Sequence, residues 1–89
     1  VLRDVNCDNA DFSGADLSGV DAEDANFTDA MLVNCRLVGA SLRDANLTNT
    51  DLRGADVTNA DLRGATLPDG EEYTRGMTLE AFGAVGRPR

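Results

Sequence analysis

The side chains that could do chemistry in this 89-residue chain are almost all carboxylates. The sequence holds sixteen Asp and Glu residues and two cysteines, Cys7 and Cys35, but neither His nor Lys. Carboxylate oxygens can bind hard cations such as calcium. The absent residue types supply most general bases, Schiff-base amines and imidazole metal ligands. The composition therefore predicts that the protein is not an enzyme and carries no cofactor.

The net charge of −8 restricts the class of partner. A strongly acidic chain binds phosphate backbones and anionic membranes poorly, and no apolar run approaches the roughly 20 residues that span a bilayer. We expect another protein as the partner, with no nucleic acid and no membrane. The chain begins with Val1 rather than Met, which leaves its compartment undetermined. The cytoplasm is slightly favoured, and a lumenal or periplasmic location stays open.

A five-residue repeat must position these side chains. An apolar residue, most often Leu, recurs at every fifth position from Leu2 to Leu67, and a small residue, mostly Ala, lies two positions before it. Most repeats end in Gly, Asn or Asp. Neither the helical period of 3.6 nor the strand period of 2 explains this spacing. Short extended pieces that bend at each Gly, Asn or Asp would place both apolar positions inside, and stacked neighbours would continue the core.

The pattern resembles that of the pentapeptide-repeat family, Ala-(Asp/Asn)-Leu-X-X, as in Ala15-Asp16-Leu17-Ser18-Gly19. The resemblance covers residues 1–69. It implies an all-β fold, a right-handed four-sided (quadrilateral) parallel β-helix with four pentapeptides per coil. Residues 1–69 would then form a rigid acidic rod of about three and a half coils, in which residues twenty apart stack roughly 4.8 Å apart. Cys7 and Cys35 would point inward on opposite faces, which does not suit a disulfide.

One stacked column would contain three acidic residues, Asp4, Asp24 and Asp44, and is a weak candidate for a metal site. Arginines occupy the adjacent column, where they would neutralise the same charge. Turns also favour Asp for its local hydrogen bonding. A structural role at the turns is therefore the preferred interpretation.

Apolar residues also occur at outward positions, where the motif is normally polar. These residues, with a nearby arginine, form a candidate interaction surface: Met31, Val33, Arg36 and Val38. We predict that this surface contacts another chain or the C-terminal segment.

The repeat ends at Pro68-Asp69-Gly70, which predicts a turn. Residues 70–89 are expected to form this turn, a short capping helix and a loose tail from residue 86. Thr78 is the expected N-cap of the helix. The apolar groups that would cover the open end of the coil are Tyr73, Met77, Leu79 and Phe82. No matching cap precedes Leu2, so the N-terminal end is either a cut edge or a dimer surface.

These features favour a non-enzymatic structural or protein–protein interaction module of unassigned biochemical role. A homodimer could form through an uncapped coil end or through the face around Met31, Val33 and Val38. The alternative is a DNA mimic that binds a DNA-handling protein such as a type II topoisomerase, as gyrase-protecting members of the family do. A rod of about 17 Å would be short beside a duplex turn of roughly 34 Å, which weakens that alternative.

Overall fold

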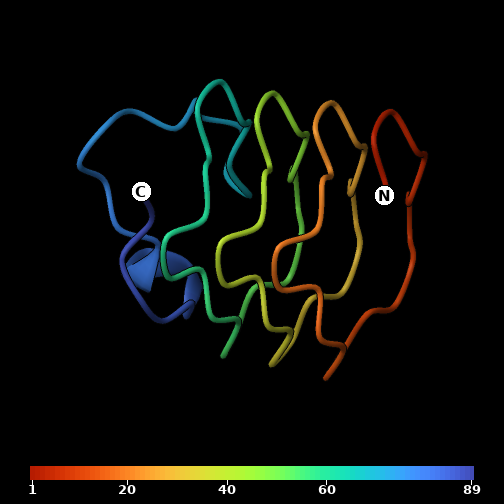
Figure 1. The fold of residues 1–89 in the computed structure, drawn as a ribbon, viewed down its shortest axis with the longest axis horizontal. Helices are drawn as coiled ribbons and strands as arrows, with labels where there is room; N and C mark the ends of the chain where they lie inside the picture. The colour runs from red at the N-terminus through yellow and green to blue at the C-terminus, as the bar shows by residue number, and fades with distance from the viewer.

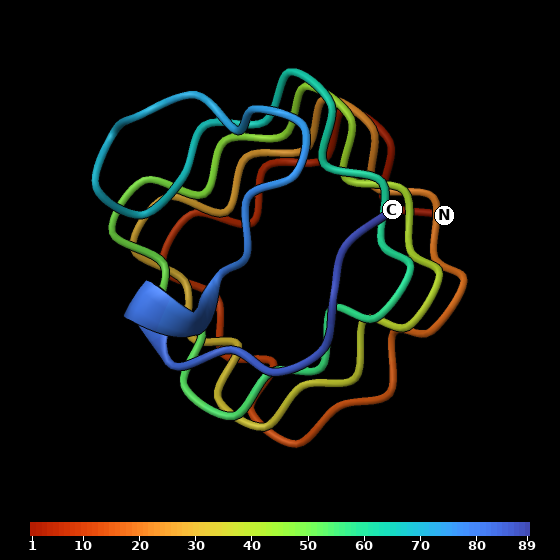
Figure 2. The ribbon, with the colours of Figure 1, turned by 90° about the vertical axis from the view of Figure 1, so that its left-hand side faces the viewer.

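The computed structural model describes all 89 residues, Val1 to Arg89, and shows a stack of similar coils (Figure 1). Parallel β-bridges join residues twenty positions apart, beginning with Asn6 and Asn26 and continuing along the stack to Asn46 and Thr66. A register of twenty residues places four five-residue repeats in each turn. A view along the stack shows the coils lying over one another (Figure 2). The predicted β-helix type of fold is confirmed.

Regular secondary structure is sparse because corners interrupt the chain at every repeat. The β-bridges are isolated, one residue long, and separated by two-residue turns. The single helix is η1 (Glu80–Phe82), one turn of 3-10 helix. No helix has the length and apolar character needed to cross a membrane.

Each corner is a tight turn with one residue in the left-handed region of the backbone. The amide of Ala15, for example, donates to the carbonyl of Phe12 over 2.9 Å. The residue just before the small position has a positive φ, 71° at Gly19 and 62° at Asp24. Glycine adopts this conformation freely, and Asn and Asp tolerate it better than other residues. This requirement explains why repeats end in Gly, Asn or Asp.

The polar residue before each central apolar residue supports the same corner. Its side-chain Oδ1 accepts a hydrogen bond from the backbone amide two residues later, over 2.9–3.2 Å. This bond occurs at Asn6, Asp11, Asp16, Asp21, Asn26, Asn46, Asp51, Asp56 and Asp61. Such Asx-type bonds stabilise turns. Much of the acidity of the chain therefore serves the corners of the fold.

The core runs along the axis of the coil. Central residues such as Leu37 and Leu42 are fully buried, and the small residues let the backbone approach them. Burying each large side chain contributes roughly 1.5–3 kcal/mol, offset by ordering entropy. Phe12 and Phe27 also meet edge to face, with ring centroids 6.1 Å apart.

The molecule is shorter relative to its width than the expected rod. Its principal extents are 27 × 23 × 23 Å, so its length barely exceeds its width. The reason is geometric: stacked coils advance by only about 4.8 Å each, whereas four repeats make a wide coil.

The C-terminal segment first turns back on the last repeat. The amide of Gly70 donates to the carbonyl of Leu67 over 2.8 Å, closing the predicted turn. The chain then runs antiparallel to the preceding stretch, with a bridge between Thr66 and Glu72. The backbone amide of Tyr73 donates to the carbonyl of Ala65 over 2.9 Å.

The predictions of a capping helix and a loose tail need correction. The helix is the three-residue η1; its N-cap is Leu79 rather than Thr78, and no side chain caps it. One 3-10 turn leaves little helical backbone for a capping bond to stabilise.

The tail is fixed in the ladder rather than loose. The backbone amide of Asn59 donates to the carbonyl of Arg87 over 2.9 Å, and the backbone amide of Arg89 donates to the carbonyl of Ala60 over 2.8 Å. Val85 forms a parallel bridge with Asp56, and Pro88 is buried. The tail therefore begins another layer on the last coil, because its backbone can satisfy the open edge there.

Candidate functional site

The three acidic residues of the candidate metal column lie at corners of the coil. Asp4, Asp24 and Asp44 all have positive φ values, 60°, 62° and 59°. No group of three or more His, Cys, Asp or Glu side chains lies close enough together to hold a metal ion. The structure thus places these residues at turns and does not bring their carboxylates together as ligands.

The candidate interaction surface is less apolar than its sequence suggests. Met31 is 42% exposed and bridges Asp11 and Asp51, so acidic residues lie on both sides of it. Val33 and Val38 are only half-buried, and Arg36 is exposed. Met31 is therefore the one large apolar side chain that this face offers freely to a partner.

The two cysteines are separate, free and buried. Burial raises the pKa of each thiol, and the charge of Asp16 adds to the effect at Cys35. A raised pKa keeps a thiol protonated and unreactive, which suits small core residues.

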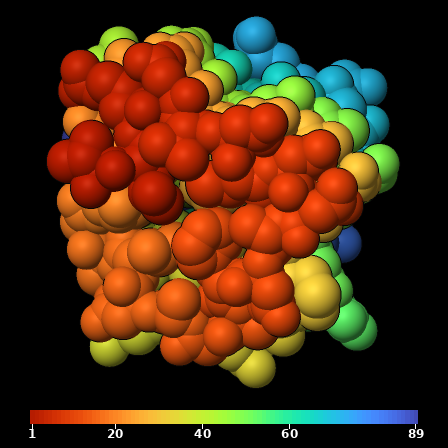
Figure 3. All heavy atoms as spheres, turned by 90° about the vertical axis from the view of Figure 1, so that its right-hand side faces the viewer, coloured from red at the N-terminus to blue at the C-terminus, as the bar shows by residue number.

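The N-terminal end of the coil exposes groups that are hidden elsewhere. Within residues 1–89 no segment packs over the first coil, whose atoms occupy most of this end face (Figure 3). Val5 is 38% exposed, and six other inward residues of this coil are only partly buried, whereas their counterparts in later coils are buried. The six are Leu2, Ala10, Phe12, Ala15, Leu17 and Val20. Cys7 is the one inward residue of this coil that is buried.

The backbone of this end is also unpaired. The amides of Asn6, Asp11 and Asp16 make no backbone hydrogen bond, whereas the amide of Asn26, one coil later, donates to the carbonyl of Val5 over 3.0 Å. The N-terminal end therefore combines partly exposed apolar groups with a free β edge.

The opposite end is closed by the predicted capping residues. Tyr73 and Leu79 are buried, and Met77 and Phe82 are partly buried against the core. The hydroxyl of Tyr73 donates to the carbonyl of Met77 over 3.4 Å. A hydrogen-bonded tail, rather than a helix, completes the closure.

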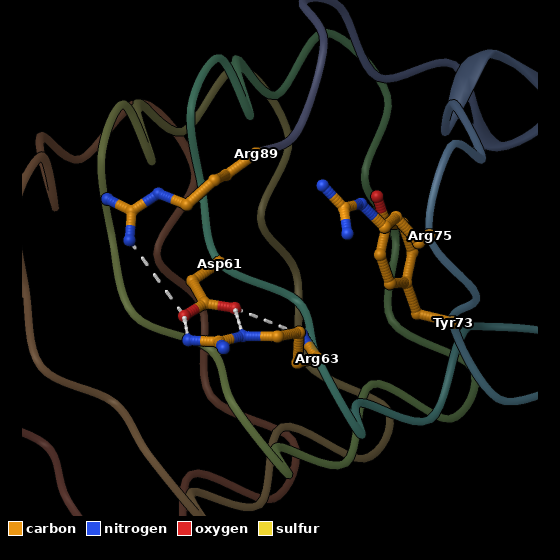
Figure 4. Close-up of a pocket in the computed structure, with 5 residues that line it drawn as sticks. All are labelled: Asp61, Arg63, Tyr73, Arg75 and Arg89. Carbon is orange, nitrogen blue, oxygen red and sulfur yellow. Dashed lines mark hydrogen bonds and ion pairs between the residues drawn. The ribbon is translucent and has the colours of Figure 1, made fainter.

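A pocket that no sequence pattern predicted lies beside this closed end. Its volume is about 290 Å³, and its lining consists of Asp61, Arg63, Tyr73, Arg75 and Arg89 (Figure 4). These residues come from the last coil, the returning segment and the tail. Only the pairing of the tail with the coil brings them together, so no local motif could reveal them.

One ion pair organises this pocket. Asp61 is buried, and its carboxylate accepts from Arg63 Nε over 2.9 Å and from the Arg63 guanidinium Nη2 over 2.7 Å. Arg89 approaches the same carboxylate to 4.0 Å. The hydrogen bonds from Arg63 lower the pKa of Asp61, against an opposing effect of burial.

Comparisons with known proteins agree with the repeat. The profile of pentapeptide repeats matches eight copies, over residues 6–44 and 30–67. No curated protein matches the chain significantly.

Three solved structures illustrate the likeness. HetL, a pentapeptide repeat protein involved in heterocyst differentiation regulation in the cyanobacterium Nostoc, is 29% identical, with 76% of this chain and 40% of HetL covered and a TM-score of 0.36. A pentapeptide repeat protein of the Arabidopsis thaliana thylakoid lumen is 27% identical. The match covers 94% of this chain and 57% of that protein, with a TM-score of 0.44. A pentapeptide repeat protein from the cyanobacterium Cyanothece is 28% identical. The match covers 92% of this chain and 60% of that protein, with a TM-score of 0.32.

The chain spans between 40% and 60% of the length of these structures. The repeat profile, in contrast, covers well over half of the chain itself. Together with the twenty-residue register of the coils, this match shows that the chain belongs to the pentapeptide-repeat family.

Proposed function

We propose that this protein is a non-enzymatic structural and protein–protein interaction module, and that the open N-terminal end of its coil is the contact surface. The observation that carries the proposal is the contrast in burial between the first coil and the later coils. Val5 and its inward neighbours are partly exposed, whereas Ala25 and Ala45, which stack in the column above Val5, are buried. Apolar groups beside free backbone donors suit the addition of another β edge.

The occupant that we propose is a second copy of the chain, placed end to end. Two identical first coils related by a twofold axis would pair their free edges as antiparallel strands. The end is about 23 Å across in each direction, which offers on the order of 500 Å² per partner and predicts a weak dimer. Because each copy carries a charge of −8, added salt should strengthen this association.

The finer geometry of the coil is part of the same proposal. We infer a right-handed, four-sided coil of about three and a half turns over residues 1–69. The register of twenty residues supports four repeats per turn. In Figure 2, where the C-terminal end faces the viewer, the chain runs anticlockwise as it approaches, which supports the right-handed sense.

Sedimentation velocity over a concentration series tests the interaction surface. The wild-type chain should self-associate at high micromolar concentration, and Val5→Asp should abolish this because it puts a charge on the apolar end. Val85→Asp is the matched control, since Val85 is 51% exposed at the other end. Met31→Asp examines the competing face.

Loss of association in Val5→Asp alone supports the proposal. Loss in Met31→Asp alone would move the contact to the side of the coil, and a monomeric wild-type chain at every concentration would overturn self-association. The DNA-mimic alternative has no comparable support, because the longest extent of 27 Å is shorter than one duplex turn of roughly 34 Å.

A further inference from the structure

The pocket at the closed end is a local reversal of charge on an acidic molecule. Three of the five residues that line it are arginines, and the only acid is Asp61. Three positive charges and one negative charge leave a surplus of two positive charges, on a chain whose net charge is −8. We propose that this pocket binds the dianionic phosphate group of a small soluble phosphate monoester.

The guanidinium groups are available to a ligand to different degrees. Arg63 is committed to Asp61 through two side-chain hydrogen bonds, and Arg89 approaches the same carboxylate only to 4.0 Å. Arg75 forms no ion pair and donates no side-chain hydrogen bond within the chain. In Figure 4 the Arg75 side chain lies across the pocket from the Asp61–Arg63 pair. Arg75 and Arg89 are therefore the expected donors.

Backbone hydrogen bonds hold the segments that carry these donors in place before any ligand arrives. The amide of Arg89 donates to the carbonyl of Ala60 over 2.8 Å, and the amide of Tyr73, two residues before Arg75, donates to that of Ala65 over 2.9 Å. The buried ring of Tyr73 forms part of the wall. Because three segments are anchored to one coil, binding needs little reorganisation of the chain.

The arrangement favours phosphate over carboxylate. One arginine can bind a planar carboxylate through two parallel hydrogen bonds. Donors that approach from different segments suit the several oxygen atoms of a tetrahedral group instead. The surplus of two charges matches a dianion, which a phosphate monoester becomes above about pH 6. The volume of about 290 Å³, roughly that of ten water molecules, also has room for a small organic substituent.

The acidic surface around the pocket limits the size of the ligand. Long polyanions and anionic membranes would meet the carboxylates of the corners along with the three arginines, and the net charge of −8 repels them. A small soluble anion can reach the pocket without this penalty.

Isothermal titration calorimetry with inorganic phosphate and glycerol phosphate, at constant ionic strength, tests the proposal. Both should bind in the millimolar range or tighter, sulfate should compete, and acetate should not. The phosphate affinity should rise between pH 5 and pH 7, about the second phosphate pKa near 6. The affinity of sulfate, which stays dianionic, should not change.

Variants assign the binding to this pocket. Arg75→Gln should weaken phosphate binding about tenfold, as expected for the loss of a charged hydrogen bond. Arg36→Gln is the matched control, because Arg36 is exposed, forms no ion pair and lies away from the pocket. Asp61→Asn should tighten binding, since it removes the only negative charge of the lining.

Several results would overturn the proposal. These are the absence of heat with phosphate up to tens of millimolar, equal binding of acetate, and unchanged affinity in Arg75→Gln. Tighter binding of a DNA oligonucleotide or an anionic vesicle than of glycerol phosphate would also overturn it, because the ligand would then be a polymer or a membrane.

Discussion

The two ends of this coil differ although the same repeat builds both. At the N-terminal end no part of residues 1–89 stacks on the outer side of the first coil, so Leu17 and Phe12 are only partly buried and the amide of Asp11 has no backbone partner. At the C-terminal end the tail runs along the last coil, and Leu79 is fully buried. A repeat specifies how coils stack on one another but not how a stack ends. Ends therefore depend on residues that leave the repeat.

The comparison also separates two kinds of surface. The open end offers apolar groups and a free β edge, which suit another protein. The closed end has satisfied its edge, and the segments that do so bring Arg75 and Arg89 beside Asp61. Closing a coil can thus create a pocket that no single repeat contains.

The largest expected effect contrasts the middle of the coil with its open end. Leu17 and Leu37 are twenty residues apart and stack in the same column, but only Leu37 is fully buried. Leu37→Ala should lower the free energy of unfolding by about 2–5 kcal/mol, because it leaves a cavity. Leu17→Ala should lower it by roughly half of that or less, because this side chain is already partly hydrated. Urea unfolding at low protein concentration measures both.

Equal losses in the two variants would show that the first coil is covered in solution. Repeating the measurement at high protein concentration would then extend the test, because self-association should raise the cost of Leu17→Ala alone.

A smaller effect is expected where the tail contacts the last coil. Gly86 has a φ of 86°, and a Cβ there would overlap Thr58 Oγ1 and crowd Asp56 Oδ1. Gly86→Ala should therefore cost about 1–3 kcal/mol and release the tail. Gly70→Ala is the matched control, because Gly70 has a φ of 87° but open space around it. It should show only the cost of the backbone conformation, about 1–2 kcal/mol.

Hydrogen exchange distinguishes tail release from general destabilisation. The amides of Val57 and Asn59 donate to the tail, so they should lose protection in Gly86→Ala and keep it in Gly70→Ala. Unchanged protection in Gly86→Ala would mean that the tail tolerates the extra methyl group.

Most of the fold could be predicted from the sequence because each repeat states the same local rule many times. The inward positions of Leu37 and Ala45, the corner residues and the turn after Leu67 all follow from that rule. The repeat did not predict the role of Asp56, whose Oδ1 accepts a hydrogen bond from the backbone amide of Thr58.

The tail and the pocket could not be predicted, because they depend on a single long-range pairing. Nothing periodic marks residues 83–89, so the sequence suggested a loose end. Ala84 directly follows Gly83 and lies two residues before Gly86, so it resembles the small inward residue beside the corners of the repeats. The candidate interaction surface stays a prediction: Val33 and Val38 break the polar pattern, and both are half-buried at their corners.

The smallest expected effect compares the ion pairs at the two ends. Asp21 accepts from the Arg3 guanidinium over 2.6 Å at the open end, and Asp61 accepts from that of Arg63 over 2.7 Å at the closed end. In both cases the arginine hydrogen bond lowers the pKa of the carboxyl group below its usual value. A lowered pKa in the folded state stabilises the protein above the unfolded pKa of about 3.9, and this contribution disappears as the pH falls through the folded value.

At pH 7, Asp61→Asn should lower the free energy of unfolding by up to about 1 kcal/mol after allowing for the exposed arginine, and Asp21→Asn should lower it less. Below pH 4 the difference between each variant and the wild type should shrink, as thermal melts across the pH range can measure. A loss in Asp21→Asn as large as that in Asp61→Asn would show that burial at the closed end does not strengthen its ion pair.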